Sequence, residues 1–112
     1  MSTAAALPAV VVRYFALMDS TDKSAAAALF TPDARVADDG KVYDGAVDIA
    51  GWLAREAGAY TFTSTQLSSE VVDDRVIVVN RLEGNFPGGV VDLRHVFVVS
   101  GDDRIRALTI AP

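Results

Sequence analysis

The second half of the chain alternates between apolar and polar residues, and this alternation limits the possible folds more than any other feature. Four segments show it, each rich in Val, Thr, Ile or Phe, and they cover residues 60–72, 75–86, 89–100 and 104–110. The turn signals "DD", "PGG" and "GDD" separate them. A period of two sends successive side chains to opposite faces of a strand. The pattern therefore predicts four strands joined in an antiparallel meander.

An apolar stripe near the N-terminus predicts the first helix. Its members recur at the spacing of one helix face, and they are Leu7, Val10, Val11, Tyr14 and Met18. Ser2 or Thr3 is a candidate N-cap, and Pro8 is tolerated in the first helical turn. Because the stripe faces the core, we expect the side chain of Tyr14 to point inward.

Two more helices are predicted before the meander. The Ala-rich segment 23–30 predicts a short helix that is stopped by Pro32. A third helix is expected over residues 47–57, with Gly58 as its C-cap. One face of this third helix holds Ile49, Trp52 and Leu53.

Between the second and third helices, Asp39-Gly40 is a turn signal that separates two short extended pieces. Helices followed by antiparallel strands make an α+β domain. A chain of 112 residues is long enough for one such domain and too short for two. A strongly bent sheet with the helices over one face would enclose a cone-shaped cavity.

The residue inventory argues against several classes of site and partner. There is no cysteine and only one histidine, so disulfides, thiolate chemistry and the usual zinc sites are excluded, and we expect no metal and no cofactor. A net charge of −5 without any Lys/Arg cluster argues against nucleic acid. No apolar run approaches the roughly 20 residues of a membrane span. We therefore expect a soluble, cytoplasmic protein that has no membrane partner.

Three stretches resemble the nuclear-transport-factor-2-like (NTF2-like, or SnoaL-like) superfamily. They are "VVVRYFALMDSTDKSAAAALFTPDARVADDG", "YDGAVDIAGWL" and "HVFVVSGDDRIRAL", and the resemblance covers nearly the whole chain. It implies a single domain over residues 1–112, folded as a cone-shaped α+β barrel in which three N-terminal helices pack on a strongly bent antiparallel sheet. The superfamily includes isomerases, dehydratases, epoxide hydrolases, polyketide cyclases and non-catalytic binding modules, so the fold does not settle the function.

Bacterial ketosteroid isomerase is similar to this chain at individual residues. That enzyme carries a Tyr on its first helix, an Asp base 24 positions later and a protonated Asp on a late strand; here "AVVVRY" places Tyr14 and "ALFTPDARVAD" places Asp38 at the first two positions. His95 occupies the third position in place of the acid. The resemblance implies proton transfer on a small hydrophobic carbonyl compound, steroid-like or polyketide-like. Asp38 would be the base, and Tyr14 and His95 would stabilise the enolate.

Each of these three residues also has a purely structural interpretation. His95 shares its strand face with apolar residues, and it is either a packed core residue or a hydrogen-bond donor in a cavity. Tyr14 is either a core aromatic whose hydroxyl bonds to the backbone or a donor to a ligand oxygen. Asp38 lies two residues after Val36 on a predicted strand, so its side chain should point to the same inward face. It is either a general base or a cap of the turn beside Asp39.

Five further residues are predicted to line the ligand pocket. Met18 lies on the first helix and Trp52 on the third, while Phe62, Asn80 and Phe97 lie on strands. Asn80 is alternatively an amide paired with backbone groups, and Trp52 alternatively an ordinary core residue.

The opposite face of the late strands mixes charged residues with apolar ones, the latter being Ile77, Val79, Val96 and Val98. An exposed sheet face this apolar favours burial against a second copy, so we expect a homodimer of the kind common among relatives. The competing functional hypothesis is a non-catalytic dimeric module whose cavity holds a small hydrophobic molecule. That hypothesis needs the same pocket wall and no base.

Overall fold

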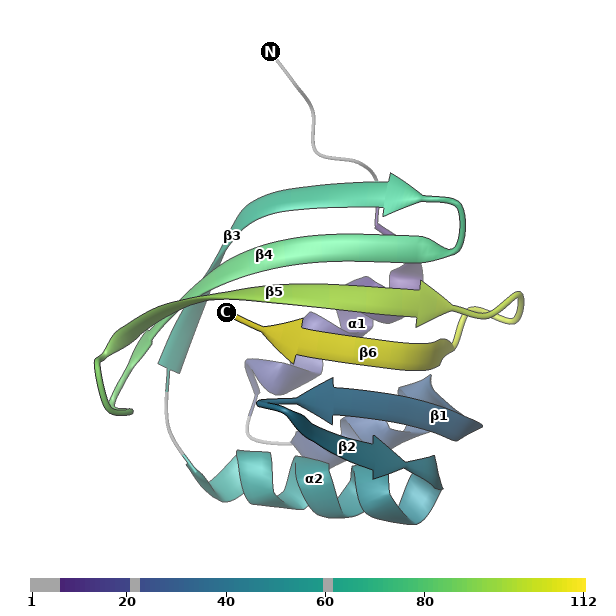
Figure 1. Cartoon of the computed structure of the whole chain (residues 1–112), viewed down its shortest axis with the longest axis horizontal. Helices are drawn as coiled ribbons and strands as arrows, with labels where there is room; N and C mark the ends of the chain where they lie inside the picture. The colour runs from purple at the N-terminus through teal and green to yellow at the C-terminus, as the bar shows by residue number, and fades with distance from the viewer. Residues whose placement is uncertain (1–6, 21–22, 60–61) are drawn as a thin grey trace.

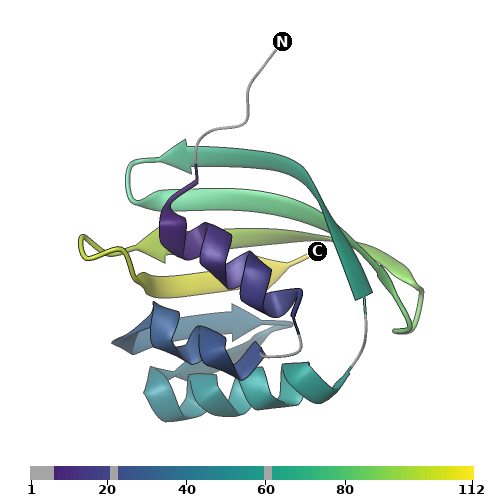
Figure 2. The same ribbon diagram turned by 180° about the vertical axis from the view of Figure 1, so that it is seen from behind.

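The protein folds as a curved six-stranded sheet with its helices packed against one face (Figures 1 and 2). The structure is a computed structural model that describes residues 7–20, 23–59 and 62–112. Its elements are α1 (Ala9–Met18), the 3₁₀ helix η1 (Lys23–Leu29), β1 (Phe30–Asp38), β2 (Lys41–Asp44), α2 (Gly45–Ala59), β3 (Phe62–Val72), β4 (Arg75–Gly84), β5 (Val90–Val99) and β6 (Ile105–Ala111). This arrangement confirms the predicted α+β class, with three helices on a bent sheet.

The first helix has the predicted inward face but a different start. α1 begins at Ala9, and Pro8 is its N-cap instead of a residue of its first turn. Pro8 has φ −55° and ψ 147°, an extended backbone at a position where the missing N–H removes no helical hydrogen bond. The candidate caps Ser2 and Thr3 lie outside the described residues. The buried side chains of α1 are Val10, Val11 and Tyr14.

The second helix is a 3₁₀ helix, and the prediction that Pro32 stops it is wrong. η1 ends at Leu29 because Phe30 already pairs with Ile105 in the sheet. Pro32 lies inside β1, where the register shifts between Phe30 and Arg35. A proline is tolerated in such an irregular stretch because no ladder hydrogen bond is required of it there.

The third helix is longer than the sequence predicts at both ends. α2 spans Gly45–Ala59, so Gly58 lies within the helix and is not its C-cap. A glycine inside a helix costs only about 1 kcal/mol relative to alanine. Burial of the predicted inner face outweighs that cost, since three of its side chains are almost fully enclosed: Ile49, Trp52 and Leu53.

The predicted hairpin and meander are both present. Asp39 and Gly40 join β1 to β2 with φ values of 54° and 76°, a left-handed pair that matches the twist of a two-residue hairpin. β3, β4, β5 and β6 pair antiparallel in chain order. The strand predicted over residues 60–72 begins at Phe62, because residues 60 and 61 lie outside the described part of the chain.

One strand pair was not predicted. β1 pairs with β6 in parallel, so the sheet is mixed and its strand order is β2-β1-β6-β5-β4-β3. The partners are far apart in sequence, and local alternation carries no information about such a pairing. β6 thereby joins the early hairpin to the meander.

The sheet bends most along β3, β4 and β5, whose long strands curve over the helices (Figure 1). In β3 the register against β4 shifts between Gln66 and Ser68, which leaves Leu67 as an extra residue. Such a bulge increases the local twist and bends the strand. The bend opens space between the inner face of the sheet and the helices. In the described residues, no helix is both long and apolar enough to span a membrane.

Candidate functional site

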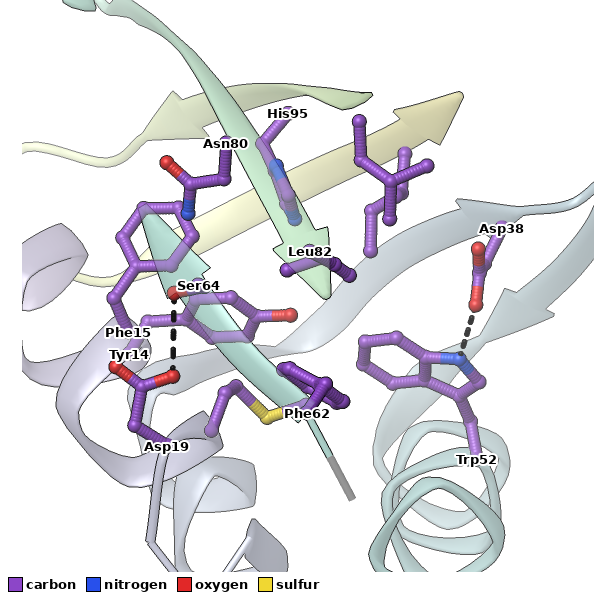
Figure 3. A pocket seen from close by; sticks show the side chains of 13 residues that line it. Tyr14, Phe15, Asp19, Asp38, Trp52, Phe62, Ser64, Asn80, Leu82 and His95 are labelled. Atoms are coloured by element: carbon purple, nitrogen blue, oxygen red, sulfur yellow. Dashed lines mark hydrogen bonds between the residues drawn. The ribbon is translucent and has the colours of Figure 1, made fainter. Parts of the chain in front are cut away.

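A cavity of about 90 Å³ lies between α1, α2 and the inner face of the sheet (Figure 3). Its lining is mostly aromatic and aliphatic, with a few polar groups, and consists of Tyr14, Phe15, Met18, Asp19, Asp38, Trp52, Phe62, Ser64, Asn80, Leu82, Leu93, His95 and Ile110. A wider pocket of about 440 Å³ shares part of this wall and extends to Phe86 and Pro87 at the end of the β4–β5 hairpin. The two together form an inner chamber and an outer chamber, with Asp38 lining both.

Seven of the eight predicted site residues line the inner chamber: Tyr14, Met18, Asp38, Trp52, Phe62, Asn80 and His95. Phe97 does not, and its ring is fully buried in the core. It packs against Tyr14 and Phe15, with ring centroids 5.3 and 5.6 Å apart. α1 covers this part of β5, so Phe97 supports the cavity wall from behind, and its predicted place in the lining is wrong.

Tyr14 is held by a cluster of rings. It is only 2% exposed, and it meets Phe15, Phe30 and Phe97 edge-to-face at centroid distances of 5.4, 6.2 and 5.3 Å. Edge-to-face contacts of this kind fix ring orientation as well as burying area. The Tyr14 hydroxyl extends into the cavity (Figure 3). A phenol positioned in this way can act as a hydrogen-bond donor whose orientation is already set.

His95 lies on β5 and is 6% exposed. Its ring packs against Phe15 at 5.1 Å. Burial lowers the pKa of His95 from 6.5 to about 4, and backbone groups of Val78 and Leu93 oppose this shift only in part. The imidazole is therefore neutral near pH 7, when it carries one N–H donor and one acceptor nitrogen. Within the described residues, its Nδ1 has no hydrogen-bond partner.

Asp38 ends β1 and is held there by both neighbouring strands. It pairs with Lys41 on β2 and with Ile110 on β6, so the strand does not fray at this point. The Nε1–H of Trp52 donates a hydrogen bond of 3.0 Å to Asp38 Oδ2. This bond links α2 to the sheet at one side of the cavity (Figure 3). Asp38 is thus a carboxylate in the cavity wall, at the end of a strand that is paired on both sides.

Several lining residues were missed by the sequence reasoning. Leu82 and Leu93 share the strand parity of Asn80 and His95, so the alternation alone could have found them. Asp19 and Ser64 carried no such signal. Asp19 is the C-cap of α1, and its Oδ1 accepts a 3.3 Å hydrogen bond from the Ser64 hydroxyl on β3.

The cavity lining carries only negative charge. Its charged members among the described residues are Asp19 and Asp38, and it includes no Lys or Arg. The Lys23 ammonium lies 5.5 Å from the centroid of the Phe62 ring without lining the cavity. A cavity with two carboxylates and a neutral histidine disfavours anionic ligands and suits neutral or cationic ones.

The fold and the cavity define a class of small α+β domains that enclose a pocket between helices and a bent sheet. The profile of the SnoaL-like domain family matches residues 11–108, and the chain belongs to this family. No match was found among curated proteins.

Solved structures with this fold come from several proteins. A proposed polyketide cyclase from Sinorhizobium meliloti is 34% identical with a TM-score of 0.85, and the alignment covers 94% of this chain and 95% of that one. A hypothetical protein with a ketosteroid-isomerase-like fold from Catenulispora acidiphila, solved in complex with trimethylamine, is 21% identical with a TM-score of 0.83, covering 96% and 87%. SalBIII, an epoxide hydrolase/cyclase-like enzyme in salinomycin pyran ring formation, is 20% identical with a TM-score of 0.77, covering 90% and 85%.

Proposed function

We propose that the protein catalyses isomerase-type proton transfer on a small hydrophobic carbonyl compound. One observation carries the proposal: Tyr14, Asp38 and His95, from three different elements, line one cavity. A base and two hydrogen-bond donors around one small apolar space are the groups that enolisation requires.

Asp38 serves as the base in this scheme. Its carboxylate removes a proton from the carbon next to the carbonyl, and the electrons of that C–H bond move into an enolate. The same carboxyl then returns the proton to another carbon of the conjugated system, so the double bond shifts and no co-reactant is consumed. Trp52 positions the carboxylate through its 3.0 Å hydrogen bond to Oδ2. An oriented base of this kind contributes typically about 10²–10⁴-fold in rate.

Tyr14 and His95 stabilise the oxygen of the enolate as it develops charge. The Tyr14 hydroxyl and an N–H of the neutral imidazole each donate a hydrogen bond to that oxygen. Both rings are buried and held by neighbouring rings, so they need little reorganisation during the reaction. Because the pKa of His95 is lowered to about 4, this donor is uncharged and adds no positive charge to the cavity at neutral pH.

The two chambers divide the substrate between them. The inner chamber, about 90 Å³, accommodates a reacting carbonyl group but no drug-sized molecule, for which pockets of about 300–1,000 Å³ are usual. The outer chamber of about 440 Å³ has an apolar wall that suits the rest of a larger substrate. Asp38 lies where both meet, next to the bonds that change.

Two substrates of different size test this proposal: 3-cyclohexen-1-one and a β,γ-unsaturated 3-ketosteroid, each followed by absorbance of the conjugated enone. We expect turnover by the wild type and a loss of at least roughly 100-fold in Asp38→Asn, because the amide cannot accept the proton. Asp73→Asn, in the β3–β4 turn at φ 55°, is the matched control and should keep full activity. Absence of turnover on both substrates, or equal turnover by Asp38→Asn, contradicts the proposal.

The charge of the cavity supports a second candidate, a non-catalytic module that binds a small organic cation. Two carboxylates and the rings of Tyr14, Phe15, Trp52 and Phe62 line the inner chamber. Aromatic rings together with carboxylates are the usual environment for quaternary ammonium groups. The Catenulispora protein is solved with trimethylamine, which is in line with this candidate.

Choline and its neutral isostere 3,3-dimethylbutan-1-ol distinguish this candidate. Trp52 is the only tryptophan of the chain, so its fluorescence reports occupancy of the cavity. A cation site should bind choline at least roughly threefold more tightly than the alcohol, and Asp38→Asn should remove the difference. Equal binding of the two ligands would reject a cation site.

A further inference from the structure

Asn80 is a buried polar side chain for which neither the fold nor the proposed proton transfer gives a use. It lies near the middle of β4, is 4% exposed and lines the cavity. Its Oδ1 is buried and has no hydrogen-bond partner within the described residues. A buried acceptor without a partner is destabilising, so its presence calls for an explanation.

Asn80 lies beside His95 at the inner end of the cavity. In the β4–β5 ladder, Val78 is opposite His95 and Asn80 is opposite Leu93, so Asn80 and His95 are diagonal neighbours on one face. The His95 ring extends from the sheet toward the cavity, and the Asn80 side chain lies beside it with its Oδ1 on the side away from His95 (Figure 3). His95 Nδ1 is the second buried atom there that has no partner in the described part of the chain.

The chemistry of Asn80 Oδ1 limits which ligand group can form a hydrogen bond with it. An amide oxygen can only accept, so its partner must bring a hydrogen, which a carbonyl or ether oxygen lacks. An anionic partner is disfavoured because Asp19 and Asp38 line the same cavity. A hydroxyl group fits, since it can donate to Asn80 and is small enough for the inner chamber.

We propose that Asn80 recognises a hydroxyl group, and that the ligand of this cavity is a small hydroxy ketone. The inference rests on the proposed function, in which His95 and Tyr14 hold the carbonyl oxygen. Because Asn80 is a diagonal neighbour of His95, the hydroxyl lies within a few bonds of the carbonyl, as in a β-hydroxy ketone.

A matched pair of ligands tests this recognition: 3-hydroxycyclohexanone and cyclohexanone, titrated into the ¹⁵N-labelled protein and followed by NMR. We expect the wild type to bind the hydroxy ketone roughly fivefold more tightly, as one added hydrogen bond to a buried acceptor allows. In Asn80→Leu, a variant of similar shape without the acceptor, the two ligands should bind equally. That variant should also be at least as stable as the wild type, since it removes an unpartnered polar group.

The control is Thr31→Val. Thr31 Oγ1 is another buried atom that has no partner in the described residues, but it does not line the cavity. This substitution should leave the fivefold preference intact. The side-chain amide resonance of Asn80 provides a measurement that needs no variant, because it should shift with the hydroxy ketone and not with cyclohexanone.

The possible binding results distinguish a failure of hydroxyl recognition by Asn80 from a failure of the proposed function on which it rests. Binding of cyclohexanone with no preference for the hydroxy ketone overturns the inference alone, and means that water or another group satisfies Asn80. A preference that persists in Asn80→Leu overturns it as well. If neither ketone binds, carbonyl binding itself fails and the hydroxy-ketone inference fails with it.

Discussion

The neutral His95 makes the stability of the protein depend on pH. Burial lowers the pKa of this imidazole to about 4 in the folded protein, against about 6.5 in the unfolded chain. Between these values the unfolded state binds more protons than the folded state, so acid favours unfolding. The contribution of His95 is fully present above pH 6.5 and is lost as the pH falls toward 4. Its size is on the order of 3 kcal/mol.

We therefore predict that the free energy of unfolding of the wild type falls more steeply between pH 6.5 and 4 than that of His95→Leu. Urea unfolding at a series of pH values measures both curves, and the carboxylates that titrate in each cancel in the comparison. An NMR titration of the imidazole gives the folded-state pKa directly. A value near 6.5 would show that the ring is solvated, which is incompatible with the buried position described above.

The candidate site also shows how far residue-level reasoning from sequence extends. Strand parity identified the face of His95 and Asn80, because the period of two is a property of the strand itself. It failed for Phe97, which lies on the same face but beneath α1. Parity specifies a face, whereas the depth of a residue under a helix depends on packing between distant segments. Asp19 was missed for the same reason, since its place in the cavity follows from where α1 ends over β3.

At the scale of elements, turns and helix interiors make opposite demands on glycine. Gly40 has φ 76° in the β1–β2 hairpin, and a Cβ there would meet no heavy atom within 4 Å. Gly51 lies inside α2, where a Cβ would make only ordinary contact, 3.7 Å from the Arg55 guanidinium. Because an added methyl group would not be crowded at either position, alanine substitutions there test the effect of backbone conformation alone.

Alanine substitutions at these glycines should shift stability in opposite directions. Gly40→Ala is expected to lose about 1 kcal/mol through the unfavourable left-handed backbone, and Gly51→Ala to gain about 0.5–1 kcal/mol through helix propensity. Thermal unfolding measures both, with an expected change of roughly 4–8 °C per kcal/mol for a domain of this size. The same sign for the two substitutions would contradict the backbone conformations assigned here.

The sequence predicted which elements exist better than it predicted where they end. The alternating segments and the Asp39-Gly40 turn were visible because each is encoded by neighbouring residues. The start of α1 at Ala9 and the inclusion of Gly58 in α2 depend on what each helix packs against. The parallel pairing of β1 with β6 depends on contacts across most of the chain, which no local pattern records.

At the scale of the whole molecule, the outer face of the sheet carries an apolar surface. Its half-buried members are Ile77, Val79, Val96 and Val98. Arg81 and Asp92 lie opposite each other on the same face and form a 2.8 Å ion pair. The described helices lie against the other face (Figures 1 and 2). We propose that two copies associate through this outer face. Burial of the face is favourable because its side chains are largely apolar and its opposite charges are paired.

Sedimentation velocity at micromolar concentration tests the dimer. The wild type should sediment as a species of twice the 11.8 kDa chain mass, and Val96→Lys should shift it to the monomer by placing a charge in the centre of the interface. Val47→Lys is the control, because Val47 is 86% exposed on α2, away from the proposed interface. A wild-type species of 11.8 kDa alone would exclude this association at that concentration.

The position of β6 has a consequence for how the chain acquires its structure. Among the described strands, β6 alone connects the β1–β2 hairpin to β3, β4 and β5, and it follows the other five in the sequence. Before Ile105 pairs with Phe30, 75 positions earlier, β1 and β5 each have one edge that lacks its partner strand. Closure of the sheet, and with it of the cavity, is therefore a non-local step that is expected to be slow, and before it the two open edges are sites at which another chain can pair.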